Sequence, residues 1–231
     1  MTQTSSLHPL VRLIDVRKEY VLGHRTVQAL RGLTLEIAGG SFVVLQGPSG
    51  SGKTTLLNLI GCIAQPTSGQ VLVAGKDTSR LSDNELSYFR RRMLGFVFQN
   101  FNLIPVLTAA ENIEYPLRII GVPAAEARKK TRAILEEMNL LEEAGQRPSE
   151  LSGGQCQRVA IGRALVTQPE LIIADEPTAN LDSVTGSTII RIMHQMRDRL
   201  GTTFLISTHD PQIAALAEER WMLRDGLLTD V

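Results

Sequence analysis

Cysteine and aromatic residues are scarce in this chain of 231 residues, which has two cysteines and 4% Phe, Trp and Tyr. The two cysteines, Cys62 and Cys156, lie in apolar or helical stretches, which favours reduced thiols over a disulfide framework. Net charge is also lacking, because 24 Lys and Arg residues balance 24 Asp and Glu residues. A strongly basic balance is expected of a protein that wraps nucleic acid, so the composition predicts no nucleic-acid partner.

Long hydrophobic runs are absent as well. The longest uncharged apolar run, at 56–64, is well short of the roughly 18 residues that a membrane-spanning helix needs. Residues 1–10 have no basic region followed by an apolar core, so they are not typical of a signal peptide. We therefore expect no direct insertion into a membrane, and any membrane role would come through a partner. With 43% hydrophobic residues, the chain has enough apolar material for a sizeable core.

Apolar runs recur along the chain and alternate with helical patterns. Unbroken runs are typical of strands buried on both faces of a parallel sheet, whereas alternating runs predict strands with one buried face. Strands are predicted at 11–16, 33–37, 42–46, 71–74, 171–174 and 203–207, and helices at 124–143 and 183–199. This alternation predicts an α/β fold with right-handed crossovers.

Two other segments have patterns of their own. Residues 100–165 are mostly helical in pattern and have few β-branched runs, which indicates an inserted helical subdomain. Residues 221–228 place Asp225-Gly226 between apolar residues, which predicts a β-hairpin.

A glycine-rich loop follows the strand predicted at 42–46. It matches G-x-x-x-x-G-K-[ST] in full and lies between a buried strand and a helix, as a phosphate-binding loop requires. Glycines let backbone N–H groups converge on a phosphate, and the helix N-terminus favours an anion. Lys53 would contact the outer phosphates, and the Thr54 hydroxyl would bind Mg²⁺. The predicted nucleotide-binding residues are Gly47, Pro48, Ser49, Gly50, Ser51, Gly52, Lys53, Thr54 and Thr55.

Two acidic residues, Asp175 and Glu176, follow the strand predicted at 171–174. Ligand sites in open α/β sheets lie at the carboxyl ends of the strands. Asp175 is suited to hold Mg²⁺, and Glu176 to orient or deprotonate an attacking water. Asp-Glu-Pro is also an ordinary way to leave a strand, since Pro177 cannot continue a ladder. With the phosphate loop upstream, the catalytic interpretation is favoured.

The segment Leu151-Ser152-Gly153-Gly154-Gln155 precedes a helical stretch. Ser152 and Gln155 form a capping-box pattern, which places Ser152 at a helix N-terminus. The segment is either a well-capped helix or a second anion site left open by its glycines. Two phosphate sites in one chain suggest two copies that share nucleotides across an interface.

The chain resembles the ATPase subunit of an ABC transporter over residues 11–230. The family's motifs occur in order: the phosphate loop, Gln99, LSGGQ, Asp175-Glu176, Asn180-Leu181-Asp182 and His209. The resemblance implies a single domain over 1–231, with a P-loop NTPase (RecA-like) core, an antiparallel β region near the N-terminus and the helical subdomain at about 100–165.

The resemblance also implies roles for individual residues. Tyr20 would stack on adenine, Gln99 would sense Mg²⁺, and His209 would contact the γ-phosphate as a catalytic residue beside Glu176 and Lys53. Asp182 would communicate across a homodimer that forms on binding ATP. The signature residues that would contact the partner's ATP are Ser152, Gly153, Gly154 and Gln155.

The segments 101–105 and 107–117 and the Glu176–Asp182 motif resemble most a branch containing lipoprotein-releasing, macrolide-exporting and cell-division ATPases. This implies an integral membrane permease partner and a place at the cytoplasmic face of the inner membrane. Four apolar residues after Gln99 either dock that partner or belong to the helical core: Phe101, Leu103, Ile104 and Leu107. Two alternatives stay open, a cell-division ATPase that regulates peptidoglycan hydrolysis without transport and an ABC ATPase with no membrane partner.

Overall fold

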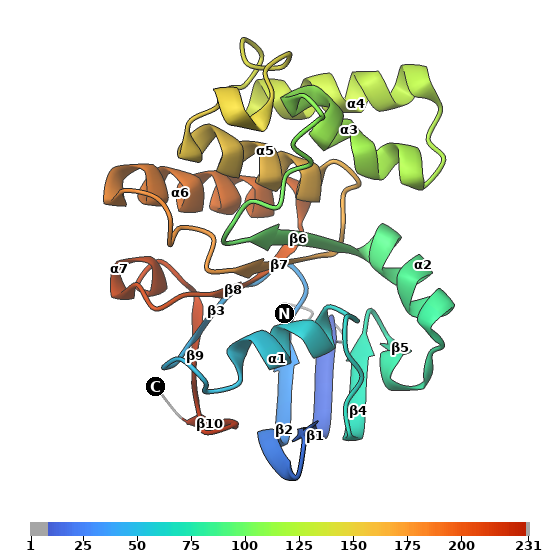
Figure 1. The fold of residues 1–231 in the computed structure, drawn as a ribbon, viewed down its shortest axis with the longest axis vertical. Helices are drawn as coiled ribbons and strands as arrows, with labels where there is room; N and C mark the ends of the chain where they lie inside the picture. Colours follow the sequence, from blue (N-terminus) through green and yellow to red (C-terminus); the bar gives the residue numbers. More distant parts are fainter. Residues whose placement is uncertain (1–8, 230–231) are drawn as a thin grey trace, which may run out of the picture.

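The computed structural model describes residues 9–229. The prediction of no signal peptide was made on residues 1–10, of which 1–8 are outside the described residues. The centre of the fold is a six-stranded sheet in the order β10-β9-β3-β8-β7-β6 (Figure 1). Five strands are parallel and β10 is antiparallel to β9. The strands are β3 (Phe42–Gln46), β6 (Leu94–Phe98), β7 (Leu171–Asp175), β8 (Thr203–Ser207), β9 (Glu219–Arg224) and β10 (Leu227–Thr229).

The parallel sheet is buried on both faces, as its unbroken apolar strands predict. Along β3, Phe42 and Val44 belong to one hydrophobic cluster, whereas Val43 and Leu45 belong to the other. Helices α3 to α6 lie over the first face, and α1 lies between the second face and a smaller sheet (Figure 1). The carboxyl ends of the parallel strands therefore meet at one edge of this two-sided core.

The smaller sheet is antiparallel, in the order β2-β1-β4-β5. Its strands are β1 (Val11–Leu22), β2 (Arg25–Ile37), β4 (Ser68–Val73) and β5 (Lys76–Asp77). The strands predicted at 11–16 and 33–37 are thus only the buried parts of a long hairpin. The prediction stopped short because most residues of the hairpin's turn end are exposed and show no hydrophobic alternation.

Helices cover the sheets and connect the strands. They are α1 (Lys53–Ile60), α2 (Asp83–Met93), α3 (Ala109–Ile119), α4 (Ala124–Glu137), α5 (Gly153–Leu165), α6 (Ser183–Leu200) and the short α7 (Pro211–Ala214), with 3-10 turns η1 (Thr78–Arg80) and η2 (Pro148–Glu150). Helices α3, α4 and α5 pack on one another within the segment 100–165. No helix among residues 9–229 is both long enough and apolar enough to cross a bilayer.

The predicted α/β class and the predicted hairpin at 221–228 are confirmed. Asp225 and Gly226 both have positive φ, 50° and 75°, as a tight two-residue turn requires. The helix predicted over 124–143 is wrong at its end, since α4 stops at Glu137. Asn139 has φ of 51°, and this left-handed residue turns the chain away from the helix axis.

Candidate active site

A cavity of about 530 Å³ lies at the carboxyl edge of the parallel sheet. It brings together the phosphate loop, both acidic residues at the end of β7, and side chains from β1 and β2. The lining residues are Tyr20, Val27, Gln28, Ala29, Gly47, Pro48, Ser49, Gly50, Gly52, Lys53, Thr54, Thr55, Gln99, Asp175, Glu176 and His209. Of the predicted phosphate-loop residues, Ser51 is the exception, since its side chain is buried behind the loop.

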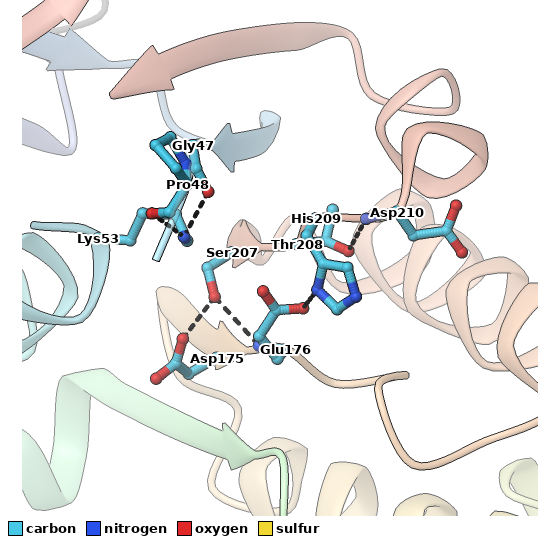
Figure 2. Close-up of polar contacts among 9 residues, drawn as sticks. All are labelled: Gly47, Pro48, Lys53, Asp175, Glu176, Ser207, Thr208, His209 and Asp210. Carbon is cyan, nitrogen blue, oxygen red and sulfur yellow. Dashed lines mark hydrogen bonds and ion pairs between the residues drawn. The ribbon is translucent and has the colours of Figure 1, made fainter. Parts of the chain in front are cut away.

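The glycines of the phosphate loop are required by its backbone. Gly47 has φ of 152°, and a Cβ there would lie 2.1 Å from the carbonyl oxygen of Leu223. Gly52, at φ of 107°, precedes α1 and offers no side chain to cap it. The first N–H groups of α1 therefore stay available to an anion. Lys53 Nζ lies 2.6 Å from Gly47 O and 3.1 Å from Pro48 O, so its charge is held within the loop (Figure 2).

Oxygen atoms suited to Mg²⁺ meet between the loop and β7. Thr54 Oγ1 donates to Asp175 Oδ2 at 3.3 Å, and Gln99 lines the same cavity. Among residues 9–229 no cluster of three or more His, Cys, Asp or Glu side chains offers a metal site. A hydroxyl, one carboxylate and an amide fit Mg²⁺, which keeps several waters and takes further ligands from substrate phosphates.

Glu176 lies directly beyond β7 with its backbone in the left-handed region, at φ of 48°. Its N–H donates both to Ser207 O, at 3.1 Å, and to Ser207 Oγ, at 3.0 Å. Ser207 Oγ is also 2.5 Å from Asp175 Oδ1 (Figure 2). Ser207 was missed by sequence reasoning, because a serine that ends an apolar run carries no motif signal.

His209 and Glu176 form a side-chain pair, with 2.9 Å between Nδ1 and Oε2 (Figure 2). An ionised carboxylate only accepts hydrogen bonds, so this contact puts a proton on Nδ1. The His209 side chain is 73% exposed and that of Glu176 only 17%. Both side chains line the same cavity, the imidazole largely exposed and the carboxylate largely buried.

Tyr20 reaches the cavity from β1, and Val27 from the paired position on β2. Lys18 Nζ lies 5.1 Å from the centre of the Tyr20 ring. Tyr20 is 38% and Val27 37% exposed, so together they form an open apolar surface beside the loop. Val27, Gln28 and Ala29 were missed because the sequence predicted a strand only at 33–37. Gly23, which has positive φ in the two-residue turn between β1 and β2, was the available signal.

The predicted signature residues do not line this cavity. Ser152 caps α5 through a capping box with Gln155, as predicted, and Gln155 Nε2 also donates to Glu143. A Cβ added at Gly154 would lie 2.7 Å from the Thr185 methyl carbon. Asp182, also outside the cavity, caps α6 by accepting from the backbone N–H groups of Val184 and Thr185. The hydroxyl and backbone N–H of Thr185 lower the pKa of the Asp182 carboxyl.

The loop of residues 99–102, which carries Gln99, is held by hydrogen bonds from two other segments of the chain. Asn180 Nδ2 donates to Gln99 O at 3.0 Å. Arg163, from α5, donates to the carbonyl oxygens of Phe101 and Asn102, both of which have positive φ. The loop that carries Gln99 is thus tied to the segment after Glu176 and to the helix that begins with the signature.

This fold, with a phosphate loop between β3 and α1 and an acidic pair at the end of β7, defines a P-loop nucleotide-binding protein. The sequence pattern of the ABC transporter family matches residues 30–179. The chain therefore belongs to the ABC transporter family, and it is an ATP-binding cassette of that family.

Relatives are of two lengths. A macrolide export ATP-binding/permease protein, MacB, from Syntrophobacter fumaroxidans is 45% identical over 95% of this chain but only 31% of its own length. An ABC transporter ATP-binding protein from Thermotoga maritima is 44% identical over 96% of this chain and 94% of its own length. The chain thus spans about a third of the MacB protein and nearly all of the Thermotoga protein.

A solved structure supports the same membership. The ATP-binding cassette MJ0796, in a dimeric post-hydrolysis state bound to ADP and Pi, superposes with a TM-score of 0.88. It is 43% identical, and the match covers 95% of this chain and 97% of that one. The predicted family and fold are confirmed.

Proposed function

We propose that the chain is the ATP-hydrolysing subunit of an ABC exporter, in which two copies close on ATP and move an integral membrane permease. The single observation that carries this proposal is the division of the site. The phosphate loop, Asp175, Glu176 and His209 share one cavity, whereas the signature residues lie outside it. The dimeric state of the MJ0796 cassette supports the same arrangement for two copies of this chain.

In the proposed reaction, each lining residue has one task. Tyr20 and Val27 hold the adenine, and Lys53 with the N–H groups of the loop holds the phosphates. Glu176 accepts a proton from the attacking water as general base. His209, whose Nδ1–H donates to the Glu176 carboxylate, keeps that carboxylate in place. Its Nε2 would donate to the γ-phosphate when the ring carries a proton on both nitrogens.

Thr54, Asp175 and Gln99 would hold Mg²⁺. The ion would neutralise charge on the β- and γ-phosphates as the terminal phosphate leaves. The donor set supports this assignment, since it consists of oxygen atoms only and leaves positions for water and phosphate.

A second copy would complete the nucleotide site. Ser152 caps α5, and Gly153 and Gly154 begin it, so the backbone N–H groups of the two glycines can bind an anion that the other copy presents. The Ser152 hydroxyl, which accepts from the Gln155 N–H, can donate its own proton to the same anion. Gln155 supports this helix end through its capping bond to Ser152. Asp182, which caps α6 beside the signature, would lie in the same interface.

We propose that the chain is a single domain over 1–231, in which α3, α4 and α5 form the helical subdomain. The permease would bind in a groove of about 340 Å³ between β6, α2, α3 and α5. The groove combines an apolar floor with arginines and is lined by Arg90, Arg91, Leu94, Gly95, Phe96, Phe98, Asn102, Pro116, Ile119, Arg163, Ala164 and Thr167. None of the four apolar residues expected to dock a partner or to form core lines this groove, and Leu103 packs against the core. Docking would place the cassette at the cytoplasmic face of the inner membrane.

The names of the relatives support export over the alternative of a cell-division regulator, since several are called macrolide export proteins. An integral permease partner is favoured for the same reason. The charge balance gives no support for a nucleic-acid partner.

Steady-state hydrolysis by the Glu176→Gln variant tests the proposed chemistry. Turnover should fall by roughly 10²–10⁴, the usual effect of removing a general base. The affinity for ATP should be retained, because the loop and Lys53 are untouched. Glu170→Gln, at an acidic residue just before β7, is the matched control and should hydrolyse ATP normally. Near wild-type turnover in Glu176→Gln would remove Glu176 from its role.

A further inference from the structure

Ser207, the last residue of β8, lies between the two acidic residues of the site. The parallel register of β7 and β8 places it opposite Asp175. Its side chain is fully buried, and its hydroxyl oxygen is 2.5 Å from Asp175 Oδ1 and 3.0 Å from the backbone nitrogen of Glu176 (Figure 2). A single hydroxyl thus contacts both residues.

The direction of both hydrogen bonds is fixed by their partners. The Glu176 N–H can only donate, so Ser207 Oγ accepts from it. The hydroxyl proton is then directed at Asp175 Oδ1, because an ionised carboxylate only accepts. The site needs a group that donates and accepts at the same atom, and only a hydroxyl does both here.

The two oxygens of Asp175 are thereby given different environments. Oδ1 is occupied by Ser207, whereas Oδ2 faces Thr54 Oγ1 at 3.3 Å. Without the hydroxyl of Ser207, only the longer 3.3 Å contact from Thr54 to Oδ2 would hold the carboxylate against rotation about its last bond, since no other described contact holds Oδ1. The orientation of Oδ2 toward the metal position depends on Ser207.

The backbone of Glu176 depends on the same residue. A non-glycine residue at φ of 48° is disfavoured and persists only where its surroundings hold it. Both acceptors of the Glu176 N–H belong to Ser207, one in the backbone and one in the side chain. This left-handed turn directs the Glu176 carboxylate to His209 instead of continuing along the strand.

We propose that Ser207 is a positioning residue for ATP hydrolysis, which acts by orienting the Asp175 carboxylate toward the metal and by holding the turn at Glu176. The proposal rests on the proposed ATPase function and adds to it a residue that does not touch the nucleotide.

The test compares Ser207→Ala with Thr203→Val in the full chain. Thr203 is the matched control, because it is a fully buried hydroxyl on the same strand that accepts from a backbone N–H, that of Gly40, away from the cavity. Each variant is measured for ATP turnover, for affinity for a fluorescent ATP analogue in EDTA, and for Mn²⁺ affinity by electron paramagnetic resonance with a non-hydrolysable analogue. Thermal unfolding reports the structural cost of each change.

We expect Ser207→Ala to lose turnover by roughly 10- to 100-fold, the size of effect that a misplaced catalytic group produces. Mn²⁺ affinity should fall several-fold, whereas metal-free nucleotide affinity should match that of the wild type. Thr203→Val should keep its turnover and Mn²⁺ affinity even if it melts at a lower temperature. Ser207→Thr, which keeps the hydroxyl, should recover part of both losses.

An unchanged Mn²⁺ affinity in Ser207→Ala, or equal losses of turnover in Ser207→Ala and Thr203→Val, would overturn the proposal. If Ser207→Ala does not fold, Ser207→Cys, a weaker donor of similar size, gives the same comparison. If the wild type itself binds ATP without hydrolysing it, the proposed function fails. The Mn²⁺ titration still tests Ser207 in that case.

Discussion

The imidazole of His209 and the carboxylate of Glu176 are joined by a 2.9 Å contact, although 33 positions separate them in the chain. They meet because β7 and β8 are neighbours in the parallel sheet, so the residues that follow both strands come to the same edge. The proposed general base and the residue proposed to contact the γ-phosphate therefore form a single unit.

The first prediction concerns this unit. His209→Ala should lower turnover by about 10²-fold or more, because it frees the Glu176 carboxylate and removes the contact to the phosphate. ATP affinity should change much less, since the phosphate loop is intact. His24→Ala, at the exposed turn between β1 and β2, is the control and should behave as wild type. If His209→Ala hydrolyses ATP as fast as His24→Ala, His209 has no role in catalysis.

The second prediction concerns pH and stability. The His194 ring stacks on Phe42 with their centres 3.8 Å apart. Burial lowers its pKa below 6.5, helped by the charge of Arg197, while Glu218 and Asp198 oppose the shift. A histidine whose pKa is lower in the folded state favours folding above its unfolded pKa and loses this contribution as the pH falls.

The free energy of unfolding should therefore decrease as the pH is taken from 7.5 to 5.5. Part of this decrease should disappear in His194→Phe, which keeps a ring against Phe42 but cannot titrate. Urea denaturation at both pH values measures the difference. An identical pH dependence in wild type and His194→Phe would contradict the assignment.

The third prediction concerns the support of the segment after Gln99. Asn112, fully buried on α3, donates to the carbonyl oxygens of Ile104, Leu107 and Thr108 and accepts from the N–H of Ile104. Asn112→Leu would leave partly buried backbone groups of Ile104 and Leu107 without this partner, at a cost of about 1–3 kcal/mol in the free energy of unfolding.

Urea denaturation measures this cost, with Tyr115→Leu on the exposed side of α3 as the control. A value for Asn112→Leu within about 0.5 kcal/mol of wild type would show that the amide network contributes little.

Sequence reasoning found the parts of the fold and site that depend on local patterns. The phosphate loop, the acidic pair and the capping box at Ser152 are each encoded within a few consecutive residues, and the structure places them as expected. Unbroken apolar runs located β3, β7 and β8 for the same reason, whereas β6 was not predicted.

Features that depend on contacts between distant segments were missed. Val27 reaches the cavity only because β1 and β2 pair along an exposed hairpin. Ser207 gains its contacts from the register of β8 against β7, which a single strand's sequence does not contain. The end of α4 at Glu137 was missed because a left-handed asparagine, Asn139, leaves no change in the hydrophobic period.

The central claim, that two copies share each nucleotide, is tested most directly by light scattering with ATP. The Glu176→Gln variant, which should hold ATP without hydrolysing it, is predicted to form a dimer of the 25.3 kDa chain when ATP is added. Adding Ser152→Arg should keep it monomeric at unchanged ATP affinity, because the new side chain blocks the helix end that meets the other copy's nucleotide. Dimers that persist with Ser152→Arg would contradict the account.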